Sequence, residues 1–162
     1  MGEVNPYAKF LDGRPVEEIL HDSMDKIAFL LEKIGAERVQ TPPAPGKWSA
    51  AEIVAHLADC EIVFAFRLRQ TLAENSPTIQ PFDQEKWGAQ YKGIGAGQAL
   101  GVFSSVRRWN LELFKNVLPA AAGRVVTHPE RGTMTFLTLV ETMAGHDLNH
   151  IAQLKRMAGE TN

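Results

Sequence analysis

The sequence lacks three features, and each absence excludes a class of protein. Cys60 is the only cysteine in 162 residues, which excludes an intramolecular disulfide and any cysteine-rich zinc site. No apolar run approaches the roughly 18 residues of a membrane span, so we expect no membrane association. Lysine and arginine do not cluster, and the formal net charge is −2, so the composition gives no reason to expect nucleic acid as a partner.

The amino-terminal stretch MGEVNPYAKFLDGRP lacks the basic start and apolar centre of a signal peptide, so we expect a cytoplasmic protein. A content of 44% hydrophobic and 22% charged residues is ordinary for a globular chain of this length. We therefore expect one domain over residues 1–162, with its core between about residues 15 and 157.

Four long segments repeat their apolar residues with the period of an α-helix, and none shows the sustained alternation of a strand. The first is expected to begin at Asp12 or Gly13 and to end at Gly35. The second begins with SAAE, in which Ser49 and Glu52 form a capping box, and it continues to about residue 74.

Two further helices follow a long connection over residues 75–97, which glycine and proline interrupt and which has room for a short helix near FDQEKW. The third long helix is expected from about Gln98 to Val117, with Arg107 and Arg108 on its solvated face. Its apolar stripe would comprise Val102, Val106, Trp109, Leu113 and Val117. The fourth follows HPERGTMT, begins at Thr133 or Thr135, and ends near residue 157. Four such helices predict an all-α four-helix bundle.

Two histidines lie four positions apart in GHDLNH, residues 145–150. Residues i and i+4 share one face of a helix, so His146 and His150 can converge on one point. Both interrupt the apolar stripe of the fourth helix, and His56 lies on the apolar stripe of the second. Three neutral imidazoles with an open position suit Zn²⁺ or Ni²⁺, so we predict a divalent metal site. The alternative is that all three are packing residues.

Four other side chains are candidates for catalytic proton transfer at such a site: Asp59, Glu61, Asp147 and His21. The carboxylates can also be surface groups or can orient a ligand histidine. His21 is explained more simply by a solvated pair with Asp25, four residues later on the same helix.

Cys60 and His128 each allow two interpretations. Cys60 follows His56 by one helical turn, where a thiolate can bind the metal but a buried thiol usually only packs. His128 precedes the fourth helix, either as a turn residue or as a group that reaches the mouth of the site.

The segments KWSAAEIVAHLADCE, PFDQEKW, HPERGTMT and GHDLNHIAQL resemble the DinB-like (DinB/YfiT) superfamily over most of residues 15–157. The resemblance implies a four-helix bundle, often homodimeric, with its long connection between the second and third helices. It also implies a divalent metal bound by His56, His146 and His150. Many relatives have a further histidine directly before the last ligand, where this sequence has Asn149.

Three imidazoles leave the charge of a divalent ion uncompensated, so the ion can activate water or stabilise a thiolate. The better-studied relatives suggest a thiol-dependent S-transferase or isomerase, in which a low-molecular-weight thiol attacks a small-molecule substrate. The second mechanism is hydrolysis of an amide or ester by metal-bound hydroxide. The third possibility is a non-enzymatic binding module in which the metal only stabilises the bundle. We place thiol transfer first.

Overall fold

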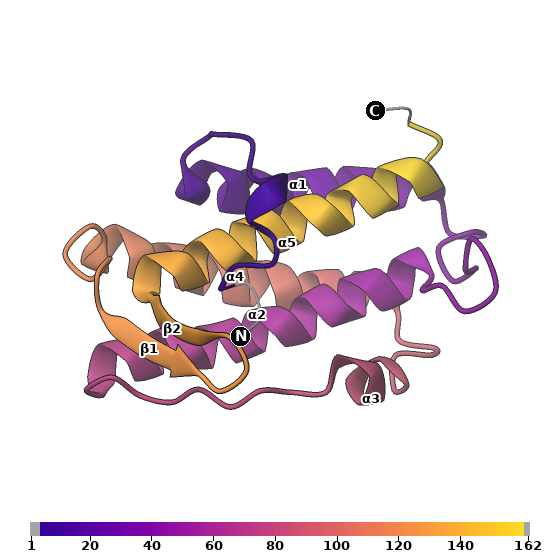
Figure 1. Ribbon diagram of the computed structural model, residues 1–162. Coiled ribbons are helices and arrows are strands. Elements are labelled where there is room, and N and C mark those ends of the chain that lie inside the picture. Colours follow the sequence, from indigo (N-terminus) through magenta and orange to yellow (C-terminus); the bar gives the residue numbers. More distant parts are fainter. Residues whose placement is uncertain (1–3, 161–162) are drawn as a thin grey trace.

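The computed structural model describes residues 4–160, which fold mainly into helices (Figure 1). The four long helices are α1 (Val16–Ile34), α2 (Ala50–Ala73), α4 (Ala96–Val117) and α5 (Phe136–Met157). The shorter elements are the 3₁₀ turn η1 (Ala8–Phe10), helix α3 (Gln84–Gly88) and strands β1 (Val125–His128) and β2 (Gly132–Thr135). The predicted four-helix bundle is confirmed. Within the described residues, no helix is long and apolar enough to cross a membrane.

The long connection between α2 and α4 determines the topology of the bundle. Helices α2 and α4 pack against each other and run in the same direction, opposite to α1 and α5 (Figure 1). Two parallel neighbours cannot be joined by a short turn, since the chain must first return along the length of a helix. Residues 74–95 make that return and contain α3, which confirms the predicted place of the long connection. Helix α5 packs against α1 and also contacts α2, so the two helices that carry the three histidines are neighbours.

The two helices that carry the histidines have well-defined starts. The Ser49 hydroxyl accepts a hydrogen bond from the backbone N–H of Glu52, and the Glu52 carboxylate accepts one from the backbone N–H of Ser49, at 3.2 and 2.7 Å. At the start of α5, the Thr135 side chain accepts from the backbone N–H of Thr138. These caps satisfy N–H groups that have no partner within the helix. Of the two predicted starts of α5, Thr135 is therefore the correct one.

The segment before α5 is a β-hairpin, although the sequence shows no sustained alternation of a strand there. Strands β1 and β2 are antiparallel, with Val126 opposite Met134 and both side chains buried. Thr127 also forms an isolated bridge with Thr78 of the long connection. Strands of four residues are too short for their alternation to stand out in a sequence, and their conformation depends on pairing with each other and with the long connection.

The buried face of α4 differs from the predicted stripe. Val102 and Trp109 are 43% and 65% exposed, whereas Phe103 and Phe114 are buried. Arg107, which was expected on a solvated face, is only 1% exposed. The prediction failed because it assigned charged residues to the surface, and α4 instead buries an arginine that is paired with carboxylates.

Candidate metal centre

Three histidines from α2 and α5 meet in the interior of the bundle. The Nε2 atom of His146 lies 3.0 Å from Nε2 of His56 and 3.1 Å from Nε2 of His150. All three ligand atoms lie within 4.8 Å of one another, and the side chains are at most 5% exposed. The structure therefore brings together the three residues that the sequence singled out.

The spacing of these nitrogens fits ligands around one divalent ion. Two nitrogens bound to a tetrahedral zinc at 2.0–2.1 Å lie about 3.3 Å apart, close to the observed separations. Hydrogen bonding between two imidazole nitrogens requires a proton on one of them, whereas one ion satisfies all three lone pairs together. The three histidines are thus close enough together to hold one metal ion.

The protonation state of the cluster also suits a metal. Burial, together with the nearby His150, lowers the pKa of His56 to about 3. Burial lowers the pKa of His146 well below its usual value, and the two neighbouring imidazoles add to the effect. Burial also lowers the pKa of His150. At neutral pH all three rings are uncharged, which is the form that binds metal.

Gln153 holds His150 in the orientation that the cluster requires. The Nδ1–H of His150 donates to Oε1 of Gln153 at 3.1 Å, which leaves the lone pair on Nε2 free to face the other two histidines. Groups that hold a ligand histidine in this way commonly contribute a factor of about 10–100 to metal affinity.

We expect Gln153→Leu to weaken zinc affinity about 10–100-fold, because the leucine cannot accept the Nδ1 proton. A competition titration against a chromophoric chelator measures this affinity. The matched control is Asn149→Leu, since Asn149 lies beside His150 but makes no hydrogen bond to it among residues 4–160. Equal zinc affinities in wild type and Gln153→Leu would remove this role.

Two aromatic side chains, Trp48 and Tyr7, cover the histidines, and the sequence analysis did not identify Tyr7. The ring of Trp48 packs on His56 with centroids 4.9 Å apart, and Tyr7 contacts His146 edge-on at the same distance. Gly145 permits the approach of Tyr7, since a Cβ there would lie 2.5 Å from the Tyr7 carbonyl oxygen. The glycine before His146 was the one sequence signal for this contact.

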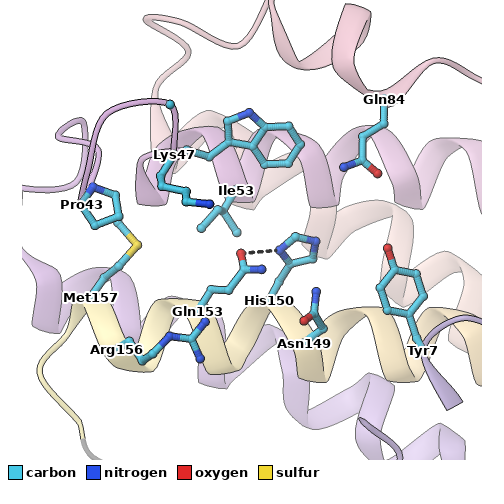
Figure 2. Close-up of a pocket in the computed structure, with 12 residues that line it drawn as sticks. Tyr7, Pro43, Lys47, Ile53, Gln84, Asn149, His150, Gln153, Arg156 and Met157 are labelled. Atoms are coloured by element: carbon cyan, nitrogen blue, oxygen red, sulfur yellow. Dashed lines mark hydrogen bonds between the residues drawn. The ribbon is translucent and has the colours of Figure 1, made fainter. Parts of the chain in front are cut away.

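His150 also lines a cavity of about 580 Å³ that opens beside the cluster (Figure 2). Asn149 and Gln153 line it from α5, and Gln84 lies on the opposite side. Tyr7 and Trp48 also line it. The volume is in the range of sites for small molecules. A metal on the three histidines would therefore have space for a ligand close to one of its protein ligands.

Two predicted catalytic carboxylates lie in a different environment from the one expected. Glu61 and Asp147 both bind Arg107, at 2.7 and 2.6 Å, in the core of the bundle. Arg107 also donates to the Leu20 carbonyl, and Asn110 donates to Glu61. Although burial opposes its charge, the two carboxylates raise the pKa of Arg107. Both carboxylates are thus committed to a buried ion-pair network that connects α2, α4 and α5.

His21 lies apart from the histidine cluster. Its side chain is 69% exposed, and its nearest carboxylate is that of Asp22, at 3.4 Å, rather than the expected Asp25. It lines a second cavity, between α1 and α4, together with Trp109. Because it is exposed and lines a different cavity, we do not assign His21 a role at the metal centre.

Cys60, Asp59 and His128 occupy three different positions. The Cys60 sulfur lies 3.5 Å from Nε2 of His56 but outside the cluster of converging ligands, and burial raises the pKa of its thiol. Asp59 is half-buried and makes no ion pair within residues 4–160. His128 ends β1, where its Nδ1 accepts from the backbone N–H of Glu130 and closes the hairpin turn.

The lowered pKa of His56 predicts how the stability of the metal-free protein depends on pH. The unfolded chain binds a proton at His56 near pH 6.5, and the folded chain does so only near pH 3. The unfolded state therefore binds more protons between these values, and acid favours it. From pH 7.5 to 5.5, we expect His56 alone to lower the free energy of unfolding by about 1.4 kcal/mol.

Urea unfolding of wild type and His56→Leu at both pH values checks this prediction. The variant lacks the His56 imidazole, so its free energy of unfolding should fall less on acidification than that of wild type, by about 1.4 kcal/mol. Parallel losses in the two proteins would mean that His56 titrates normally in the folded state.

Comparison with known proteins gives consistent results. A model of the DinB superfamily matches residues 19–154. A protein from Oceanobacillus iheyensis, provisionally named a metal-dependent hydrolase, is 23% identical and aligns over 95% of each chain. A similarly named protein from Bacillus mycoides is 23% identical over 91% of this chain and 85% of its own.

The solved structure of YfiT from Bacillus subtilis has the same fold, with a TM-score of 0.76 over 90% of this chain and 87% of YfiT. The two sequences are 23% identical, so the likeness establishes the fold alone. YfiT is itself described, again provisionally, as a metal-dependent hydrolase with an unusual four-helix-bundle topology.

Proposed function

The chain belongs to the DinB superfamily, and on this basis we propose that it is a metal-dependent hydrolase of an amide or ester bond in a small molecule. The provisional names of two relatives support hydrolysis. Thiol transfer, which the sequence analysis placed first, has less support, because the names of these relatives do not mention it.

One observation carries the proposal: His150 belongs both to the histidine cluster and to the wall of the cavity. A purely structural metal site is usually closed by four protein ligands, whereas a catalytic site keeps a position for water or substrate. A divalent ion on these histidines would supply a Lewis acid that polarises the scissile carbonyl and activates water. The adjacent cavity provides the space in which a substrate would meet it.

The residues of the chain have distinct parts in this proposal. Gln153 orients His150 through the hydrogen bond to Nδ1. Trp48 and Tyr7 pack on the other two histidines and also line the cavity. Asp59 is the candidate for proton transfer, since it is half-buried one turn from His56 and, unlike the other two carboxylates, does not bind Arg107.

Two parallel assays test the proposal on zinc- and nickel-loaded protein. The first follows 4-nitrophenyl esters and N-acyl 4-nitroanilides, and the second follows conjugation of cysteine to 1-chloro-2,4-dinitrobenzene. We expect metal-dependent hydrolysis that chelation removes and that is lost in His150→Ala. Metal-dependent conjugation without hydrolysis would favour the transferase. Metal binding without either reaction would favour a metal-stapled binding module.

We also propose, from the family resemblance, that the chain forms a homodimer. Light scattering coupled to gel filtration gives the molar mass directly. A mass near 17.9 kDa would correspond to the monomer and would contradict the proposal.

A further inference from the structure

In the described part of the chain, the charged side chains that line the cavity beside His150 are all positive. Its two charged lining residues are Lys47, from the loop before α2, and Arg156, from the last turns of α5. Among residues 4–160, no carboxylate lines it. The remaining lining is apolar or neutral, so the cavity favours an anion over a cation.

Neither cation is neutralised by a neighbouring side chain. Within residues 4–160, no carboxylate lies within 4 Å of Lys47 or Arg156. The acidic group near the end of α5, Glu160, pairs with Lys33 and Lys26 of α1 instead. Both cations are therefore available to a ligand in the cavity.

The two cations approach the cavity from opposite walls. Figure 2 shows Lys47 extending from above and the guanidinium of Arg156 reaching back along α5 toward Gln153. Six residues separate Arg156 from His150, about 9 Å along the helix axis, and long helical side chains lean toward the amino-terminal end. A charge bound between the cations would thus lie several ångströms from the histidine cluster.

We propose that Lys47 and Arg156 bind an acidic group of the substrate, a carboxylate or phosphate, while the bond to be cleaved lies at the histidine cluster. Guanidinium and ammonium groups are the usual partners of such anions, and Arg156 offers two parallel N–H donors. A cavity of about 580 Å³ restricts the substrate to a small molecule. The choice of substrate class rests on the proposed hydrolase, but anion binding does not depend on catalysis.

Binding of simple acids to the metal-free protein tests the anion site separately from the proposed hydrolase activity. The probes are glutarate and inorganic phosphate, and the neutral probe is glutaramide; isothermal titration at low ionic strength gives each affinity. We expect at least one acid to bind and the diamide not to. Preference between the two acids identifies the anionic group. Lys47→Gln and Arg156→Gln should each weaken acid binding about tenfold, and the double variant should abolish it.

Arg108→Gln and Lys115→Gln are the matched controls, since both residues line the second cavity, between α1 and α4, and not this one. They should bind the acids like wild type. Absence of acid binding, equal binding of the diamide, or unchanged affinity in the double variant would each overturn the proposal. These outcomes are measured without metal, so they do not depend on whether the protein is a hydrolase.

A second measurement uses the zinc-loaded protein and two esters, mono(4-nitrophenyl) adipate and 4-nitrophenyl hexanoate, which differ by one carboxylate. We expect wild type to have the higher kcat/KM for the acidic ester, and the double variant to lose at least tenfold of that preference. Hydrolysis of both esters with no preference would leave the hydrolase intact and contradict the anion site.

Discussion

Replacing His146 by alanine is expected to abolish stoichiometric binding of a divalent metal while leaving the helix content close to that of wild type. Nε2 of His146 lies within 3.1 Å of Nε2 of both other histidines, so its loss leaves two ligands and no third nitrogen at the shared point. Removing a group that only supports a ligand costs about 10–100-fold in affinity, so removing this ligand should cost more than 100-fold. Metal-dependent hydrolysis should be lost with the ion.

Elemental analysis after dialysis against zinc, together with far-UV circular dichroism, measures both parts of this result. His21→Ala is the matched control, because His21 is exposed and lines another cavity. The control should retain wild-type zinc content. If His146→Ala retained one ion per chain, the three histidines would not be the ligands.

Replacing Arg107 by alanine should strongly destabilise the protein, lowering the free energy of unfolding by about 3–5 kcal/mol. Arg107 is 1% exposed and bridges the equally buried carboxylates of Glu61 and Asp147. Its removal leaves two negative charges in the core without a partner and a cavity where the side chain packed.

Urea unfolding of Arg107→Ala and Arg108→Ala tests this prediction with two adjacent arginines on the same helix. Arg108 is exposed, so its replacement should change the free energy of unfolding by less than about 0.5 kcal/mol. The triple variant Arg107→Met, Glu61→Met, Asp147→Leu removes all three charges together and should recover much of the stability. Equal effects of the two alanine variants would mean that the network contributes little.

The same network has a consequence for the metal centre. Glu61 lies on α2 beyond His56, and Asp147 directly follows His146 on α5. By binding both carboxylates, Arg107 links the two helices that carry the histidines. A partial loss of zinc affinity should therefore accompany the loss of stability in Arg107→Ala.

Local sequence signals were sufficient for most helix boundaries, although α1 begins at Val16 and not at Asp12 or Gly13 as predicted. The start of α2 was predicted because a capping box depends on two residues, Ser49 and Glu52, that are close in the chain. The end of α1 was predicted from Gly35, because glycine often follows the last residue of a helix. In the structure Gly35 has a backbone φ of 82°, a conformation that glycine adopts without strain. Such features are decided by neighbours in sequence, and the structure confirms them.

Features that depend on distant partners were not predictable in the same way. Arg107 is buried because carboxylates from two other helices neutralise it, and no pattern within α4 reveals them. The face assigned to α4 was wrong for this reason, since it excluded charged residues from the core. The hairpin before α5 was missed because each strand is short and depends on its partner and on the long connection.

The candidate site also combines residues that sequence spacing predicts with residues that only the fold brings together. His146 and His150 share a helical face by spacing alone, and His56 was identified by its place on an apolar stripe. Tyr7, Lys47 and Arg156 were missed as cavity residues, because they come from the amino-terminal segment, a loop and the last turns of α5. No spacing rule connects those three positions, so only the fold brings them together.

The most direct test of the metal centre is X-ray absorption at the zinc edge on untagged protein reconstituted with one equivalent of zinc. The histidine cluster predicts one ion per chain with three imidazole nitrogens at about 2.0–2.1 Å, no sulfur ligand, and the remaining position filled by an oxygen or nitrogen atom from outside the protein. Failure to retain zinc after reconstitution, or a coordination shell without three imidazoles, would contradict the assignment of His56, His146 and His150 as a metal site.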